Sequence, residues 1–141
     1  MQIRDVMTAN PATVSPEDTI QSAARLMRDE DTGAVPVVEN GRVIGMVTDR
    51  DIVVRAVADG GQVNRPVRDV ITTHLVSVTP DSSTGEAAEL MSENQVRRLP
   101  VVENGALVGI VSLGDIAVKE GKDKRSGDTL QSISEGVKER G

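Results

Sequence analysis

Two short segments of the chain place a hydroxyl and a carboxylate three residues apart, at the start of a helical pattern. Thr48 precedes Asp51, and Ser112 precedes Asp115. A hydroxyl at a helix N-cap lies beside backbone N–H groups that have no partner within the helix, which favours an anion. A carboxylate one turn later is placed to accept hydrogen bonds from both hydroxyls of a ribose. The same spacing is also a capping box that stabilises a helix without any ligand, so both interpretations stay open.

A pair of adjacent arginines is the second candidate for chemistry. Arg97 and Arg98 precede an apolar strand pattern that begins at Leu99. A guanidinium binds phosphate through two parallel hydrogen bonds, so these residues suit a phosphorylated ligand. The alternative is a solvated pair of cations, or an ion pair with Glu93 or Asp115.

Other reactive groups are scarce. His74 is the only histidine, and the chain contains no cysteine. A single histidine in a loop is more often an ordinary polar residue than a catalytic base. The sequence shows neither a nucleophile paired with a base nor a cluster with metal-ligand spacing. We therefore expect a non-enzymatic protein with no catalytic residue, no metal site and no required cofactor.

The two hydroxyl–carboxylate pairs belong to an internal repeat with an offset of about 64 residues. The matched segments are 5–8 with 69–72, 23–27 with 87–91, 36–41 with 100–105, and 45–52 with 109–116. One copy alone is too short to bury a comfortable core, so we expect the copies to share one. We assign residues 1–62 to the first copy, 63–120 to the second, and 121–141 to a charged tail. We expect the tail to be peripheral, and either to pack on a partner subunit or to fray.

Each copy reads as strand, helix, strand, strand, helix, which predicts a mixed α/β (α+β) fold. Ser15 and Thr79, each followed by proline, are predicted to cap the first helices. The Asn-Gly pairs at 40–41 and 104–105 predict tight hairpins. The second helix of the first copy is predicted to open after Thr48 and to run to about Ala58. Each hydroxyl–carboxylate pair therefore follows the second strand of a hairpin.

The composition limits the partners. A net charge of −6 and a pI near 4.8 argue against nucleic acid, which needs clustered Lys and Arg. No apolar run approaches the ~20 residues of a membrane span, and the N-terminus does not resemble a signal peptide. We expect a cytoplasmic protein that binds neither nucleic acid nor membrane.

The absence of Phe, Tyr and Trp means that any bound base would be packed by aliphatic side chains. Candidates at the strand starts are Val35, Pro36, Leu99 and Pro100, for which a plain core role is the alternative.

The repeated unit resembles the CBS domain (cystathionine β-synthase domain). The resemblance rests on the Pro-Val-Val strand, the Asn-Gly turn and the Gly-x-Val-Thr/Ser-x-x-Asp segment, which recur in order in both copies over residues 1–120. Two such motifs in tandem resemble a CBS pair, or Bateman module, of the stand-alone class. The resemblance implies two motifs related by a pseudo-twofold axis, a homodimer of such pairs, and adenine nucleotides bound in clefts between paired motifs.

The resemblance also assigns roles. It implies that Thr48 and Ser112 help to hold phosphate, that Asp51 and Asp115 hold ribose, and that a basic residue near Arg97 and Arg98 meets phosphates. We expect a regulatory sensor of AMP, ADP or ATP, with S-adenosylmethionine as a further candidate, that changes conformation on binding and signals to a downstream protein. The alternative is a ligand-free dimerisation or interaction scaffold. Because the first copy has Gly33-Ala34 where the second has Arg97-Arg98, we expect one phosphate-competent cleft and one poorer one.

Overall fold

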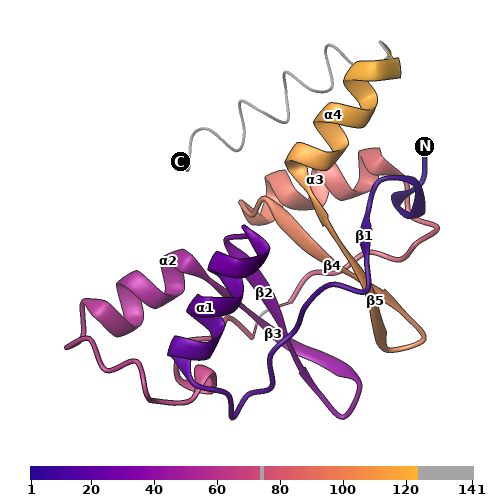
Figure 1. The fold of residues 1–141 in the computed structure, drawn as a ribbon. Helices are drawn as coiled ribbons and strands as arrows, with labels where there is room; N and C mark the ends of the chain where they lie inside the picture. Colours follow the sequence, from indigo (N-terminus) through magenta and orange to yellow (C-terminus); the bar gives the residue numbers. More distant parts are fainter. Residues whose placement is uncertain (74, 124–141) are drawn as a thin grey trace. The chain divides into compact units, whose positions relative to one another are not determined.

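The computed structural model describes residues 1–73 and 75–123 (Figure 1). His74 and the tail beyond Asp123 lie outside the described residues. The chain forms two compact units. One contains residues 11–75 and 105–107 and is called the Thr48 unit here. The other contains residues 1–10, 76–104 and those from 108 onward, and is called the Ser112 unit.

The Thr48 unit is a β-hairpin with helices packed on it. Helix α1 (Ile20–Glu30) contacts strand β2 (Ala34–Glu39), and α2 (Asp49–Ile52) contacts strand β3 (Arg42–Thr48) (Figure 1). Helix α2 continues directly into a π-helical stretch, η2 (Val53–Val57). A 3-10 turn, η3 (Val67–Asp69), precedes the segment that leads out of the unit.

The Ser112 unit repeats this plan around a three-stranded sheet in the order β1-β5-β4. Its elements are the 3-10 turn η1 (Ile3–Asp5), β1 (Thr8–Ala9), α3 (Thr84–Asn94), β4 (Arg98–Glu103), β5 (Ala106–Ser112) and α4 (Leu113–Asp123). Helix α3 contacts both β4 and α4. The elements confirm the predicted α+β class.

Each unit is completed by a segment from the other half of the sequence. In the Ser112 unit the Ile3 N–H donates to the Ser82 carbonyl at 2.8 Å, and Thr8 pairs with Ile110. In the Thr48 unit the Val67 N–H donates to the Asp18 carbonyl at 2.8 Å. The described buried residues include one main apolar cluster within each unit.

The predicted starts of the first helices are wrong by four residues. Helix α1 is capped by Thr19, whose side chain accepts the Ser22 N–H at 3.0 Å, and α3 is capped by Ser83. The predicted cap Ser15 instead opens a turn, because its N–H donates to Asp18 Oδ2 at 2.8 Å and its carbonyl accepts the Asp18 N–H. Proline after Ser15 suits the second position of such a turn as well as it suits a helix start.

The predicted hairpins are confirmed. Asn40 and Gly41 have φ values of +54° and +79°, and Asn104 and Gly105 have +52° and +82°. Two consecutive left-handed residues make the type I′ turn that matches the twist of the flanking strands, and Asn-Gly is the pair that adopts it most readily. This turn sets the register that carries β3 to Thr48 and β5 to Ser112.

Candidate ligand-binding sites

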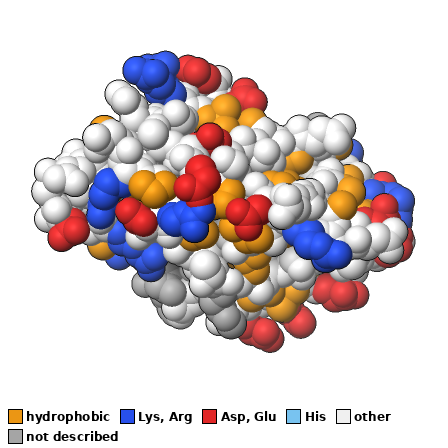
Figure 2. Space-filling view, turned by 90° about the horizontal axis from the view of Figure 1, so that it is seen from below, with side chains coloured by type: hydrophobic (Ala, Val, Ile, Leu, Met, Phe, Trp, Pro, Cys, Tyr) orange, Lys and Arg blue, Asp and Glu red, His pale blue; other side chains and the backbone are white. Residues whose placement is uncertain are grey.

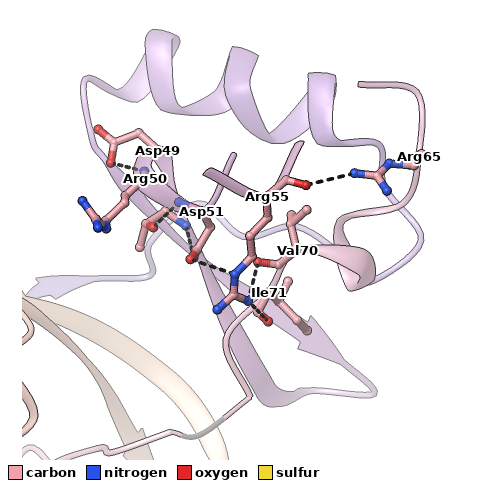
Figure 3. Close-up of polar contacts among 8 residues, drawn as sticks. Asp49, Arg50, Asp51, Arg55, Arg65, Val70 and Ile71 are labelled. Carbon is pink, nitrogen blue, oxygen red and sulfur yellow. Dashed lines mark hydrogen bonds and ion pairs between the residues drawn. The ribbon is translucent and has the colours of Figure 1, made fainter. Parts of the chain in front are cut away.

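Thr48 lies at the last position of β3 and caps α2. Its Oγ1 accepts the Asp51 N–H at 3.0 Å, and Asp51 Oδ2 accepts the Thr48 N–H at 3.0 Å. The predicted capping box is therefore formed. The Asp51 side chain is only 13% exposed, and its other oxygen, Oδ1, stands 4.0 Å from the Arg55 Nε (Figure 3).

Ser112 and Asp115 make the same arrangement in the other unit. Ser112 Oγ accepts the Asp115 N–H at 3.0 Å, and Asp115 Oδ2 accepts the Ser112 N–H at 3.3 Å. The pair lies where β5 ends and α4 begins, as Thr48 and Asp51 lie where β3 ends and α2 begins. The repeat thus produces the same geometry twice.

Capping does not use up these side chains. Each cap engages one carboxylate oxygen and the hydroxyl as an acceptor, which leaves Asp51 Oδ1, Asp115 Oδ1 and both hydroxyl protons outside the cap. An ionised carboxylate accepts through both oxygens, and a hydroxyl both accepts and donates. The two interpretations of the pattern are therefore compatible, since one set of atoms stabilises the helix start and another set remains for a ligand.

The backbone N–H groups at the start of α2 all donate to acceptors within the chain. The Asp49 N–H donates to the Gly33 carbonyl at 2.9 Å, and the Arg50 N–H donates to Asp49 Oδ1 at 2.8 Å. With the Asp51 N–H held by Thr48, all three leading N–H groups have acceptors. The Asp49 carboxylate also stands over Gly33, where an added Cβ would lie 3.0 Å from Asp49 Oδ2.

At the start of α4, fewer of the leading N–H groups have an acceptor among the described residues. The Leu113 N–H donates to the Arg97 carbonyl at 2.8 Å, and the Asp115 N–H is held by Ser112. Leucine at 113 carries no carboxylate, and in residues 1–73 and 75–123 the Gly114 N–H meets no acceptor. Among the described residues, the helix that follows Ser112 thus keeps a donor without an acceptor, where α2 has the Asp49 carboxylate.

Arg97 and Arg98 lie beside this open helix start. Arg97 is exposed, and the hydrogen bond from Leu113 to its carbonyl places its backbone at the first residue of α4. Arg98 is half-buried at the first position of β4. Within the part of the chain that the structure describes, neither guanidinium forms an ion pair, with Glu93 and Asp115 included.

The four apolar candidates lie inside the strands. Val35 and Leu99 are each 1% exposed and belong to the cores of their own units. Pro36 and Pro100 are buried, and their carbonyls accept the N–H groups of Val14 and Val78 at 3.1 Å. This burial is what the plain-core interpretation predicts, and a base would touch these residues only where a strand end meets the surface.

Arg55 is a polar residue of this neighbourhood that our sequence reasoning missed. Its Nη1 donates to the carbonyls of Val70 and Ile71, at 3.4 and 3.2 Å, while its own carbonyl accepts a hydrogen bond from Arg65 (Figure 3). The spacing of Asp51 and Arg55, four residues apart on a helix, is the signal that predicts their proximity.

The face in Figure 2 carries basic, acidic and apolar side chains interspersed. Among the described residues, no group of three or more His, Cys, Asp or Glu side chains is placed to hold a metal ion. No described helix combines the length and apolar character that a membrane crossing requires.

Comparisons with known proteins agree with this architecture. The family model of the CBS domain matches twice, at residues 3–57 and 67–119. The CBS domain-containing protein YhcV of Bacillus subtilis is 48% identical over 132 residues, which cover 94% of both chains. Hypoxic response protein 1 of Mycobacterium tuberculosis is 39% identical over 116 residues, covering 81% of each.

Two solved structures share the fold. Hypoxic Response Protein I, solved with two coordinated zinc ions, has a TM-score of 0.77 and 38% identity, covering 84% of this chain and 98% of that one. CBSX2 in complex with AMP has a TM-score of 0.77 and 26% identity, covering 88% of this chain and 98% of that one.

The fold and both helix starts define a protein built of two tandem CBS motifs. The chain belongs to the CBS-domain family, as a CBS pair that spans nearly the whole of its relative YhcV.

Proposed function

We propose that this chain is a non-enzymatic regulatory module that binds adenosine-containing ligands. The observation that carries the proposal is the hydroxyl–carboxylate pair present in both copies, in which capping leaves one carboxylate oxygen and one hydroxyl proton for a ligand. Asp51 and Asp115 are assigned to the ribose hydroxyls. Ser112 is assigned to the phosphate, whereas Thr48 caps a helix start at which the Asp49 carboxylate disfavours phosphate. The AMP complex of CBSX2, a protein of the same fold, supports this class of ligand.

The two sites differ in their tolerance of phosphate. At the Ser112 site, among residues 1–73 and 75–123, the Gly114 N–H has no acceptor and the Arg97 guanidinium has no ion pair. Both groups favour an anion, so AMP, ADP and ATP are the expected ligands there. At the Thr48 site the Asp49 carboxylate occupies the helix start and repels phosphate. That site accordingly suits the adenosine moiety itself, or an adenosine compound with a cationic group such as S-adenosylmethionine.

Regulation requires that ligand binding favour one state of the protein over another. We propose that the occupied and empty modules differ in conformation and that the functional unit is a homodimer. Support for a protein contact comes from η2, where Val53, Val54 and Val57 are 57%, 52% and 54% exposed. Three half-exposed valines on one helical stretch are typical of a surface that another chain covers.

Absorbance and calorimetry test the ligand proposal directly. The chain has no Trp, Tyr, Phe or Cys, so an adenine band in nucleic-acid-free purified protein reports a bound nucleotide. Titration calorimetry with AMP, ADP and ATP measures binding to stripped protein. We expect Asp115→Asn to weaken AMP binding, while Asp51→Asn weakens binding of unphosphorylated adenosine.

Absence of the band together with flat titrations would favour the scaffold instead. Sedimentation equilibrium then distinguishes a ligand-free dimer from a monomer. Val54→Glu is expected to weaken a dimer that uses the valine surface, and Val118→Glu, at a 63% exposed valine of the other copy, is the matched variant.

A further inference from the structure

We propose that Arg55 is a positioning residue that couples the ribose-binding carboxylate of Asp51 to residues 70–72. This stretch lies just before the point, after Leu75, at which the chain leaves the Thr48 unit. The coupling between side chain and segment stands on contacts of the ligand-free protein, and only its response to ligand rests on the proposed function.

The guanidinium of Arg55 lies between two groups that are far apart in the sequence (Figure 3). On one side its Nε faces Asp51 Oδ1 at 4.0 Å. On the other side its Nη1 donates to the carbonyls of Val70 and Ile71, at 3.4 and 3.2 Å. One side chain therefore bridges the helix that carries the ligand carboxylate and the segment that leads out of the unit.

The same segment is held from its other side by β3. Met46 and Thr72 exchange two backbone hydrogen bonds, at 3.1 and 3.0 Å. The approach is close enough that a Cβ added at Gly45 would lie 2.9 Å from the Thr72 carbonyl oxygen. Residues 70–72 are thus held between a strand and Arg55. Loosening the Arg55 side leaves the strand contact, the hydrogen bond from the Val70 N–H to Val67 and the burial of Val70.

A second arginine, Arg65, bonds to the backbone of Arg55. Arg65, from the stretch before η3, donates through Nη2 to the backbone carbonyl of Arg55 at 3.3 Å. Arg55 lies in the π-helical part of the helix, where the regular backbone pattern is interrupted and a carbonyl becomes available to an outside donor. The helix holds the 70–71 backbone and the stretch before η3 holds the helix backbone, so the two segments constrain each other.

Asp51 Oδ1 is the atom for which a ligand and Arg55 compete. Oδ2 is engaged by the Thr48 N–H within the cap, so a ribose hydroxyl would approach Oδ1. The contact of Oδ1 with Arg55 is long and the Arg55 side chain is 50% exposed, so the pair is weak enough for a ligand to replace. Binding of a diol at Asp51 therefore releases Arg55 from one anchor and loosens residues 70–72.

The second copy provides an internal comparison. The position that matches Arg55 is Lys119, and the segment that matches 70–71 is Val6 and Met7. In the described part of the Ser112 unit, no hydrogen bond joins Lys119 to either of those carbonyls. The coupling is thus a property of the Thr48 unit, which makes Asp115 a control for Asp51.

Hydrogen exchange in the full chain, read by NMR, tests the coupling without ligand. The reporters are backbone amides. The Val70 N–H donates to the Val67 carbonyl, and the Thr72 N–H donates to the Met46 carbonyl. The matching amide of the other unit is that of Val6, which donates to the Ile3 carbonyl. Arg55→Met should speed exchange at Val70 and Thr72 about three- to tenfold. Asp51→Asn keeps a capping oxygen but removes the charge, and should speed it about 1.5- to fivefold.

Two controls make the result specific. Asp115→Asn should leave exchange at Val6 unchanged, because no arginine of residues 1–73 and 75–123 bonds to both that carboxylate and the segment. The double variant Asp51→Asn/Arg55→Met should exchange no faster than Arg55→Met alone. Arg55→Lys, which installs the residue of the second copy, substitutes if Arg55→Met does not fold. The coupling is overturned if Asp51→Asn leaves Val70 and Thr72 unchanged or if the two substitutions act additively.

The response to ligand is tested by adding adenosine to the Asp115→Asn protein, in which only the Asp51 site remains. Equilibrium dialysis on the same sample reports binding. Faster exchange at Thr72 on binding, absent in the Arg55→Met background, supports competition for Oδ1, whereas slower or unchanged exchange with bound adenosine refutes it. If dialysis shows no binding, the proposed function fails at this site, and the ligand-free exchange still decides the coupling.

Discussion

Asp49→Asn should convert the Thr48 site from one that rejects phosphate to one that accepts it. Asparagine keeps an oxygen that can accept the Arg50 N–H, the contact that Asp49 Oδ1 makes at 2.8 Å, and it removes only the negative charge. The substitution therefore isolates electrostatic repulsion from helix capping. It is best made together with Asp115→Asn, so that nucleotide binding at the other site does not mask the effect.

The expected magnitude follows from the exposure of Asp49. Two like charges about 4 Å apart repel by about 1 kcal/mol in water-like surroundings, and an exposed carboxylate at the mouth of a helix is in such surroundings. A phosphate carries between one and two negative charges at neutral pH. Removing the repulsion should favour AMP by about 1 to 2 kcal/mol, which is roughly five- to thirtyfold in affinity.

Equilibrium dialysis with AMP and adenosine in parallel measures the effect. We expect AMP affinity to rise and adenosine affinity to stay the same, because adenosine has no phosphate to repel. The gain should shrink with added salt, since the charges are solvent-accessible. An equal change for both ligands, or a rise that salt does not reduce, would refute the argument that Asp49 acts by repelling phosphate.

Three further predictions concern the other site and the fold. Arg97→Met should weaken AMP binding at the Ser112 site about fivefold and leave adenosine binding unchanged, measured by dialysis; equal losses would point to a structural role. Thr48→Ala and Ser112→Ala should each lower the free energy of unfolding by about 1 kcal/mol through loss of a helix cap, measured by urea denaturation followed by circular dichroism; no loss would mean that the caps are replaced by water. Gly45→Ala should destabilise the protein by about 1 to 3 kcal/mol, because its Cβ would lie 2.9 Å from a backbone oxygen. Gly41→Ala, which meets no atom within 4 Å but has a φ of +79°, is the comparison that measures backbone strain without a clash.

Local patterns predicted the elements that carry the sites. The Asn-Gly turns at 40–41 and 104–105 were predictable because few residue pairs adopt two left-handed conformations in succession. The hydroxyl–carboxylate spacing predicted capping boxes that the structure contains in both copies. These features depend on residues within a few positions of each other, which is the range over which sequence patterns are informative.

The starts of the first helices, α1 and α3, were less predictable because competing local signals were nearly equal. Both Ser15 and Thr19 are good caps, and the proline after Ser15 fits a turn as well as a helix. The choice was made by contacts from elsewhere in the chain. The Ile20 N–H donates to the Arg65 carbonyl at 2.9 Å, and the Val67 N–H donates to the Asp18 carbonyl. A segment about 45 residues away thus holds the turn that precedes α1.

The sequence by itself determined the repeat, the hairpin registers and the two capped carboxylates, because each of these follows from residue types at short spacing. Only the tertiary structure decided that residues 1–10 complete the Ser112 unit, and that Arg55 bridges Asp51 and the 70–71 carbonyls. It also decided that the Asp49 carboxylate accepts an N–H group at the start of α2, whereas the Gly114 N–H of α4 meets no acceptor in the described parts of the chain. The contacts of residues 1–10 and those of Arg55 with residues 70–71 end on backbone groups that every residue carries, so no residue type indicates them until the fold brings the segments together.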